Sequence, residues 1–165
     1  MKSDLFAADP RRMGYVGRRP GARDSDSWFT PSRYIEAVRA VLGEIHLDPF
    51  SSDLANLTVG AKLHYTEADD AFEQSWLAGT VFMNPPFGKL FRKAVEKFVT
   101  EFEAGSFRAG IVLCNNCTET RAGQLLFGVS SAVAFPNHRL SFTNVDGKTI
   151  SSNTRGQMFC YVGPK

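Results

Sequence analysis

Residues 81–88 read Val-Phe-Met-Asn-Pro-Pro-Phe-Gly, an apolar run that ends in Asn-Pro-Pro-aromatic. The apolar run predicts a β-strand. Two consecutive prolines have no backbone N–H to donate and fix φ near about −65°, so the strand must end at Asn84 and the chain must leave in a stiff turn. In open α/β sheets, ligands and catalytic groups collect in the crevice at the carboxyl ends of the strands. We therefore expect Asn84 to lie at such a crevice.

The residue types of this turn suit methyl transfer to an exocyclic amine of a base. The lone pair of such an amine is delocalised into the ring, so its nitrogen becomes nucleophilic only when acceptors hold its hydrogens. The Asn84 side-chain oxygen and a carbonyl oxygen of Pro85 or Pro86 can supply two acceptors. Phe87 adds an aromatic face on which a flipped-out base can stack. The alternative is an ordinary exit from a strand into a turn, with no catalytic role.

Length and composition indicate one globular domain. The chain has 165 residues, of which 43% are hydrophobic and 22% are charged. No apolar run approaches the roughly 18 residues of a membrane span, and the N-terminus lacks the apolar segment of a secretion signal. The odd number of cysteines, 3, suits a reducing cytoplasm better than a disulfide scaffold. We expect a soluble cytoplasmic protein.

The N-terminal segment, residues 1–24, predicts a flexible basic arm ahead of a single domain at residues 25–165. Its stretch from position 10 to position 23 has glycines and prolines but no acid. The candidate DNA-binding residues of the arm are Arg11, Arg12, Arg18 and Arg19. Arginines on such an arm can lie along phosphates, which makes binding salt-dependent. A solvated, disordered leader is the alternative.

The stretch Trp28-Phe29-Thr30-Pro31 precedes a predicted helix over residues 32–42. Thr30 is expected as the N-cap, Pro31 as the first helical residue and Gly43 as the stop. The expected buried face holds Tyr34, Ile35, Val38, Val41 and Leu42. Free N–H groups at this helix start would accept a carboxylate, such as the amino-acid tail of S-adenosylmethionine. A cap beside a core tryptophan is the alternative.

A second polar strand end is predicted at Asp48, where residues 44–49 read as a short strand closed by Pro49. Its carboxylate can hold the ammonium of a methionine moiety; a simple turn residue is the alternative. A further short strand is expected at residues 61–65. Asp70 can reach the adenosyl group, or it caps a short helix that carries Phe72, Trp76 and Leu77. The interval between Asp48 and Asn84 is short for this fold class, so one strand is expected to be lost.

The second half of the chain predicts a strand, helix, strand pattern around a parallel sheet. A helix is expected over 89–104, a buried strand over 109–113, a helix over 119–127 and a strand over 131–136. Residues 137–142 and 157–162 suggest an antiparallel edge around a long loop. Arg139 and Arg155 make that loop a candidate DNA-contacting flap; a plain solvated loop is the alternative.

A Cys-Asn-Asn-Cys run at 114–117 raises the question of zinc. The remaining thiol and imidazole ligands are Cys160 and three scattered histidines. A structural zinc site needs four ligands, usually as two close pairs. We therefore predict no metal site.

In sequence order these pieces resemble the phage-type Dam family of DNA N-6-adenine methyltransferases. The matching residues are Trp28-Phe29-Thr30-Pro31, Ile45-His46-Leu47-Asp48-Pro49 with Asn56, Tyr65-Thr66 with Asp69-Asp70, Trp76, and Asn84-Pro85-Pro86-Phe87-Gly88. The resemblance implies a compact single-domain Rossmann-like α/β fold with a mostly parallel sheet and an antiparallel last strand. It implies transfer of a methyl group from S-adenosyl-L-methionine to adenine N6 of double-stranded DNA, in the cytoplasm of a bacterial host. Residues 84–87 would be catalytic, and Asp48 would lie in the cofactor site.

Two other functions remain open at this point. Asn-Pro-Pro-aromatic turns also occur in relatives that methylate RNA bases or protein glutamine, although those usually carry extra substrate domains. A protein that keeps the fold without the cofactor would instead be a non-enzymatic DNA-binding or host-modulating phage protein.

Overall fold

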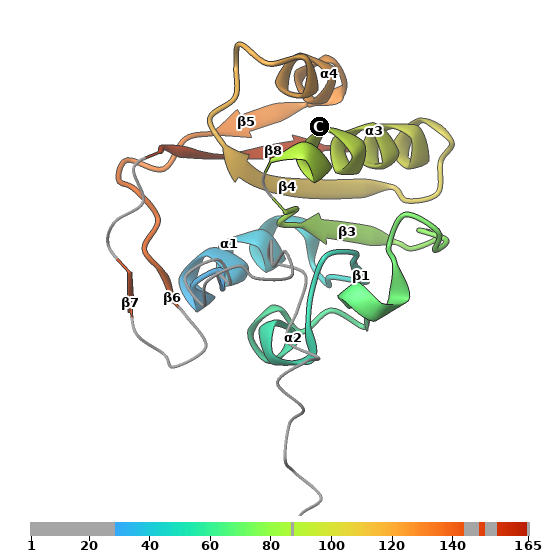
Figure 1. Ribbon diagram of the computed structural model, residues 1–165, viewed down its shortest axis with the longest axis horizontal. Helices are drawn as coiled ribbons and strands as arrows, with labels where there is room; N and C mark the ends of the chain where they lie inside the picture. Colours follow the sequence, from blue (N-terminus) through green and yellow to red (C-terminus); the bar gives the residue numbers. More distant parts are fainter. Residues whose placement is uncertain (1–28, 87, 144–148, 151–154, 165) are drawn as a thin grey trace, which may run out of the picture.

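The computed structural model describes residues 29–86, 88–143, 149–150 and 155–164. Its centre is a six-stranded sheet with the order β2-β1-β3-β4-β8-β5 (Figure 1). The strands of this sheet are β1 (Leu47–Asp48), β2 (Leu63–His64), β3 (Thr80–Met83), β4 (Ala109–Asn115), β5 (Ala132–Ala134) and β8 (Gln157–Val162). A separate two-stranded ladder pairs β6 (Phe142–Thr143) with β7 (Thr149–Ile150).

Helices cover both faces of the sheet, which gives three layers. The helices are α1 (Ser32–Leu42), α2 (Asp53–Val59), α3 (Lys89–Glu103) and α4 (Arg121–Val129), with a short 3-10 turn, η3 (Glu67–Asp69). The side chains of a strand alternate between faces. Val112 of β4 accordingly packs with the α3 and α4 side, whereas Ile111 and Leu113 pack with α1. The expected α/β class is confirmed.

The strand order reverses between β1 and β3, which lie side by side. Both strands are parallel, and Leu47 pairs with Val81. From β1 the next strand, β2, extends the sheet to one side, whereas β4 extends it from β3 to the other side. Such a reversal is a topological switch point, where the crossover connections diverge and leave a crevice at the carboxyl ends of the strands.

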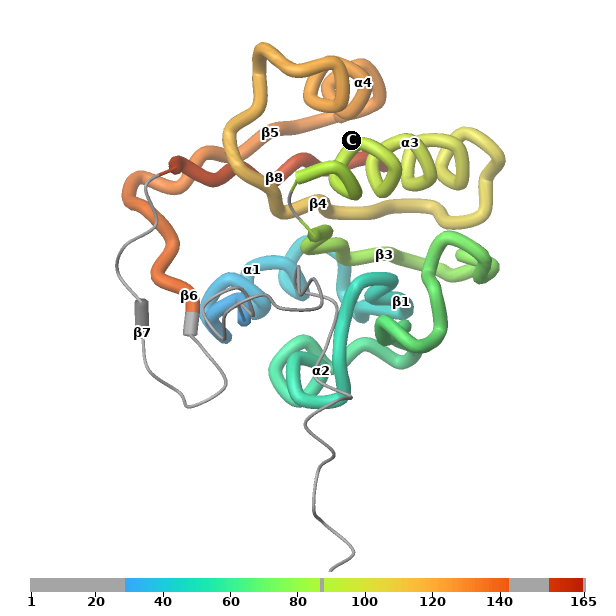
Figure 2. Tube along the Cα trace, in the orientation of Figure 1, coloured from blue at the N-terminus to red at the C-terminus, as the bar shows by residue number. Residues whose placement is uncertain are grey.

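The last strand is antiparallel, as expected, but its expected position at the edge is wrong. β8 lies between β4 and β5 and pairs antiparallel with both. Figure 2 shows the chain leaving β5 for β6 before it returns along β8. Cys160 and Val162 of β8 are buried, and a strand with buried side chains is stabilised by neighbours on both sides. The outer edge belongs to β5, whose three residues are exposed.

The first helix has the predicted range, residues 32–42, but its predicted cap is wrong. Pro31, not Thr30, occupies the N-cap position of α1, and no side chain caps that helix. The Thr30 hydroxyl instead accepts a hydrogen bond from Asn84. On the predicted buried face Ile35, for example, is fully buried, but Val41 is 61% exposed.

No helix forms after Asp70, contrary to the prediction for Phe72, Trp76 and Leu77. Asp70 has a φ of 49° and ends η3 instead of starting a helix. The Trp76 indole Nε1 donates to the Ala71 carbonyl oxygen at 2.9 Å, which closes a compact loop around the buried ring. Leu77 is 80% exposed. The spacing of these apolar residues therefore reflects a loop folded around one tryptophan.

The helix expected over 119–127 begins two residues later, at Arg121, because Thr120 is its N-cap. The Thr120 hydroxyl accepts from the Gly123 N–H at 3.0 Å, and it also donates to the Cys117 carbonyl oxygen. The loop after β4 is thereby folded back onto the first turn of α4. A Cβ added at Gly123 would collide with the Cys117 carbonyl oxygen, so only glycine fits here.

We predict opposite effects of alanine at the two glycines of α4. Gly123→Ala should lower the free energy of unfolding by about 1–3 kcal/mol, because backbone atoms of the neighbouring loop must move. Gly128→Ala should raise it by up to about 1 kcal/mol, because no atom lies within 4 Å of the added Cβ and alanine favours the helix. Urea denaturation of the two variants measures the difference. Equal effects would show that the loop accommodates the methyl group.

Candidate active site

Two polar side chains lie at the carboxyl ends of the two strands that flank the switch point. Asp48 is the last residue of β1, and Asn84 directly follows β3. Because Leu47 pairs with Val81, Asn84 is about two strand positions, or roughly 7 Å, beyond the level of Asp48. Pro85 and Pro86 follow, and both are buried. The predicted strand end is thus confirmed.

The Asn84 amide is buried and only half satisfied. It is 7% exposed, and its Nδ2 donates to the Thr30 hydroxyl oxygen at 3.2 Å. Its Oδ1 has no hydrogen-bond partner among the described residues. A buried acceptor without a donor costs about 1–3 kcal/mol. Asn84 Oδ1 is therefore an acceptor that a bound molecule can satisfy.

The Asp48 carboxylate is buried, and the described residues place no lysine or arginine against it. It is 3% exposed. Burial raises the pKa of Asp48 to about 6, and the Ser51 hydroxyl, the Phe50 N–H and the distant charge of His64 offset only part of that rise. The Phe50 N–H donates to its Oδ1 at 3.3 Å. A cationic group bound beside Asp48 would restore its ordinary acidity.

Two other predicted cofactor residues, Pro49 and Asp70, are among those that the structure describes. Pro49 directly follows Asp48 in the chain and is buried. Asp70 is exposed, its Oδ1 accepts from the Phe72 N–H at 3.1 Å, and no described hydrogen bond joins it to Asp48 or Asn84. Trp28 lies outside the described residues, as do Phe87 and the arginines Arg11, Arg12, Arg18 and Arg19.

Arg139 and Arg155 are brought to the same edge of the sheet by the buried Gln157. Gln157 Oε1 accepts from the Leu140 N–H at 3.2 Å, and its Nε2 donates to the Arg155 carbonyl oxygen at 2.7 Å. The same Nε2 donates to Asn115 Oδ1, at the carboxyl end of β4. Both arginine side chains are exposed. Sequence reasoning missed Gln157, because a glutamine that begins a hydrophobic strand gives no signal of its partners.

The three cysteines, all free and buried, lie together where β4 meets β8. A hydrogen bond from the Cys114 thiol lowers the pKa of Cys117. No group of three or more His, Cys, Asp or Glu side chains among the residues that the structure describes has an arrangement that could hold a metal ion. None of the described helices is long and apolar enough to cross a bilayer.

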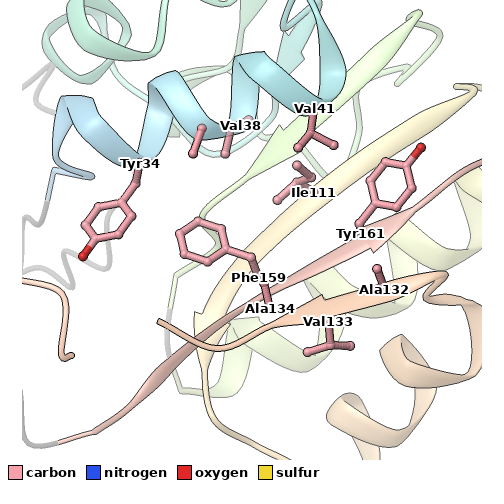
Figure 3. A pocket seen from close by; sticks show the side chains of 10 residues that line it. Tyr34, Val38, Val41, Ile111, Ala132, Val133, Ala134, Phe159 and Tyr161 are labelled. Carbon is pink, nitrogen blue, oxygen red and sulfur yellow. The ribbon is translucent and has the colours of Figure 1, made fainter. Parts of the chain in front are cut away.

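An apolar groove of about 300 Å³ lies apart from the two strand ends, between α1 and the strands β4, β8 and β5 (Figure 3). Tyr34 and Phe159 stack across it with ring centroids 5.8 Å apart. Its lining residues are Tyr34, Ala37, Val38, Val41, Ile111, Ala132, Val133, Ala134, Phe159 and Tyr161. None of these residues is charged, so the groove lacks the cations that a phosphate backbone requires.

The fold defines an α/β protein with buried polar groups at the switch point of a mostly parallel sheet. Comparison with known families identifies the chain more closely. The sequence model of the DNA N-6-adenine-methyltransferase (Dam) family matches residues 20–164, and the chain belongs to that family. A search among proteins of curated function found no match.

We predict that Asp48→Asn stabilises the ligand-free protein at neutral pH. Because the native state binds the Asp48 proton more tightly than the unfolded state does, stability falls as pH rises from about 4 to about 6. The full penalty, on the order of 2–3 kcal/mol, is present above that window. Asparagine cannot ionise, so the two proteins should differ at pH 7.5 and converge towards pH 4. Urea denaturation across this range measures the effect, and a pH-independent difference would contradict the raised pKa.

Proposed function

We propose that the protein transfers a methyl group from S-adenosyl-L-methionine to N6 of an adenine that has been flipped out of double-stranded DNA. The membership of the Dam family gives the class of reaction. The single observation that supports the site is the buried, unpartnered Oδ1 of Asn84 at the carboxyl end of β3.

The residues at the switch point fit the proposed methyl donor. When bound, that donor supplies an electrophilic methyl group on a sulfonium. The buried Asp48 carboxylate has no lysine or arginine partner among the described residues and would pair with the ammonium of its methionine moiety. Thr30, Pro31, Pro49 and Asp70, with Trp28, complete the proposed surroundings. No glycine-rich turn follows Asp48, so side chains must supply more of the contacts.

Asn84 would bind the adenine amine through its free acceptor. Its Oδ1 accepts one N6 hydrogen, and a carbonyl oxygen of Pro85 or Pro86 accepts the other. Thr30 holds the Asn84 amide so that Nδ2 is occupied and Oδ1 faces the base. As N6 forms the new bond it gains positive charge, so these acceptors bind the transition state more strongly than the ground state. Phe87 would stack on the flipped base.

DNA binding would use the exposed arginines at this edge of the sheet. Arg139 and Arg155 lie beside Gln157, and Arg11, Arg12, Arg18 and Arg19 would add contacts from the N-terminal segment. Contacts to phosphates position the duplex but carry no sequence information. A phage or prophage origin, a host cytoplasmic location and a Rossmann-like sheet that lacks one strand remain predictions from the resemblance.

Product analysis tests the reaction. Purified protein, unmethylated DNA and S-adenosylmethionine should yield N6-methyladenine on mass spectrometry of the digested DNA. N4-methylcytosine alone, or methylation of RNA or protein glutamine in place of DNA, would overturn the substrate. Absence of cofactor binding by calorimetry would instead favour a non-enzymatic DNA-binding protein.

Asn84→Ala should keep the fold and cofactor binding but lose on the order of 10²-fold or more in turnover. The expected size follows from removal of one preorganised polar group in a transition-state site. Stability should not fall much, because the lost Oδ1 has no hydrogen-bond partner among the residues that the structure describes. Single-turnover methylation gives the rate, and calorimetry gives the cofactor affinity. Full activity of this variant would remove Asn84 from the reaction.

Thr30→Val should lower turnover several-fold without weakening binding of DNA. Valine has the shape of threonine but cannot accept from Asn84 Nδ2, so the amide is free to rotate away from the base. A neutral hydrogen bond contributes about 0.5–1.5 kcal/mol, which corresponds to roughly 2- to 12-fold in rate. Thr30→Ser keeps the hydroxyl and should keep the rate. Equal rates for the valine and serine variants would show that Thr30 does not orient Asn84.

A further inference from the structure

Two adjacent buried serines follow β1, and they differ in what their hydroxyls do. Ser51 and Ser52 are each 1% exposed. Ser52 Oγ accepts from the Ala55 N–H at 3.0 Å and is the N-cap of α2. Ser51 donates its backbone N–H to the Tyr65 carbonyl oxygen at 2.9 Å, but its Oγ has no hydrogen-bond partner among the described residues. The hydroxyl of Ser52 caps a helix, whereas that of Ser51 makes no hydrogen bond of ordinary geometry to the described residues.

An unpartnered hydroxyl in this position carries a cost that alanine would avoid. Leaving a buried polar group unsatisfied is unfavourable by about 1–3 kcal/mol. Among the described residues the side-chain atoms in this condition are Ser51 Oγ and Asn84 Oδ1. Both residues follow strands at the switch point. Ser51 lies three residues after Asp48, the end of β1, and Asn84 lies directly after β3. The unsatisfied groups therefore coincide with the crevice.

Ser51 Oγ lies close to the Asp48 carboxylate. The hydroxyl is near enough to offset part of the rise in the Asp48 pKa that burial causes. The two groups do not reach ordinary hydrogen-bond geometry. The turn from Asp48 through Phe50, whose N–H donates to Asp48 Oδ1, brings the two side chains together. The Asp48 carboxylate, an acceptor, and the Ser51 hydroxyl, a donor, are thus buried next to each other after β1.

We propose that Ser51 binds the α-carboxylate of the methyl donor while Asp48 binds its α-ammonium. Both charged groups of an α-amino acid are attached to one carbon, so the protein groups that bind them must be neighbours. An ammonium only donates and takes Asp48; a carboxylate only accepts and takes a hydroxyl donor. This inference rests on the proposed function of Asp48, and it adds the residue that recognises the acidic half of the amino acid.

The test compares Ser51→Ala with the matched control Ser52→Ala by calorimetry and thermal unfolding. For Ser51→Ala we expect the dissociation constant of S-adenosylmethionine to rise roughly ten-fold or more, as for loss of a hydrogen bond to a charged group, with an unchanged or higher Tm. For Ser52→Ala we expect a lower Tm, because the helix cap is lost, and a nearly unchanged dissociation constant.

Decarboxylated S-adenosylmethionine identifies the group that Ser51 contacts. Wild-type protein should prefer the intact donor, and Ser51→Ala should lose most of that preference while binding the decarboxylated compound as wild type does. An unchanged preference, or a Tm that falls as far as in Ser52→Ala, would overturn the role of Ser51 even if wild type binds the donor. Failure of wild type to bind S-adenosylmethionine would overturn the proposed function itself.

Discussion

The parallel pairing of β1 with β3 is the constraint on which the site depends. It places Leu47 opposite Val81 in the buried centre of the sheet, so the chain segments that follow, at Asp48 and Asn84, emerge at one edge. β2 and β4 then extend the sheet in opposite directions, which leaves that edge open at the reversal. Removing the β1–β3 pairing would separate the two polar ends even if each strand kept its own conformation.

The polar groups at this edge lower the stability of the free protein, and the apolar layers compensate. Within the part of the chain that the structure describes, Asp48 is buried without a lysine or arginine partner, and Asn84 Oδ1 and Ser51 Oγ are buried without hydrogen-bond partners. On both faces of the sheet, by contrast, side chains such as Phe98 and Ile35 pack into continuous apolar clusters. Groups that are unsatisfied in the free protein gain the most when a ligand supplies their partners. These buried polar groups lie at the same edge of the sheet, and their shared location is therefore evidence for a binding site.

Local chemistry explains which features could be predicted from sequence. The two prolines end β3 at Asn84 by removing donors, and the helix α3 follows from the periodicity of Lys89–Glu103. The position of β8 could not be predicted, because an almost wholly apolar strand carries no information about which strands flank it. The helix expected after Asp70 was wrong because a single indole hydrogen bond from Trp76 favours a loop at apolar spacings that also suit a helix. Ser51 gave no signal, because the sequence does not show that its hydroxyl lacks a partner among the described residues.

The hydroxyl of Thr30 links the start of the first helix to the turn after β3, and this link explains why the predicted cap is absent. One hydroxyl oxygen near a helix start can accept from a helical N–H or from a distant side chain, and here it accepts from Asn84 Nδ2. Because the N-cap residue, Pro31, has no N–H, the start of α1 has one backbone donor fewer to satisfy, so the loss of the side-chain cap costs little. The backbone N–H groups of the helix start and the side-chain amide of Asn84 are thus alternative donors to the same oxygen. In the structure it accepts from Asn84, so Thr30 helps to set the orientation of the Asn84 amide, whose Oδ1 has no partner among the described residues.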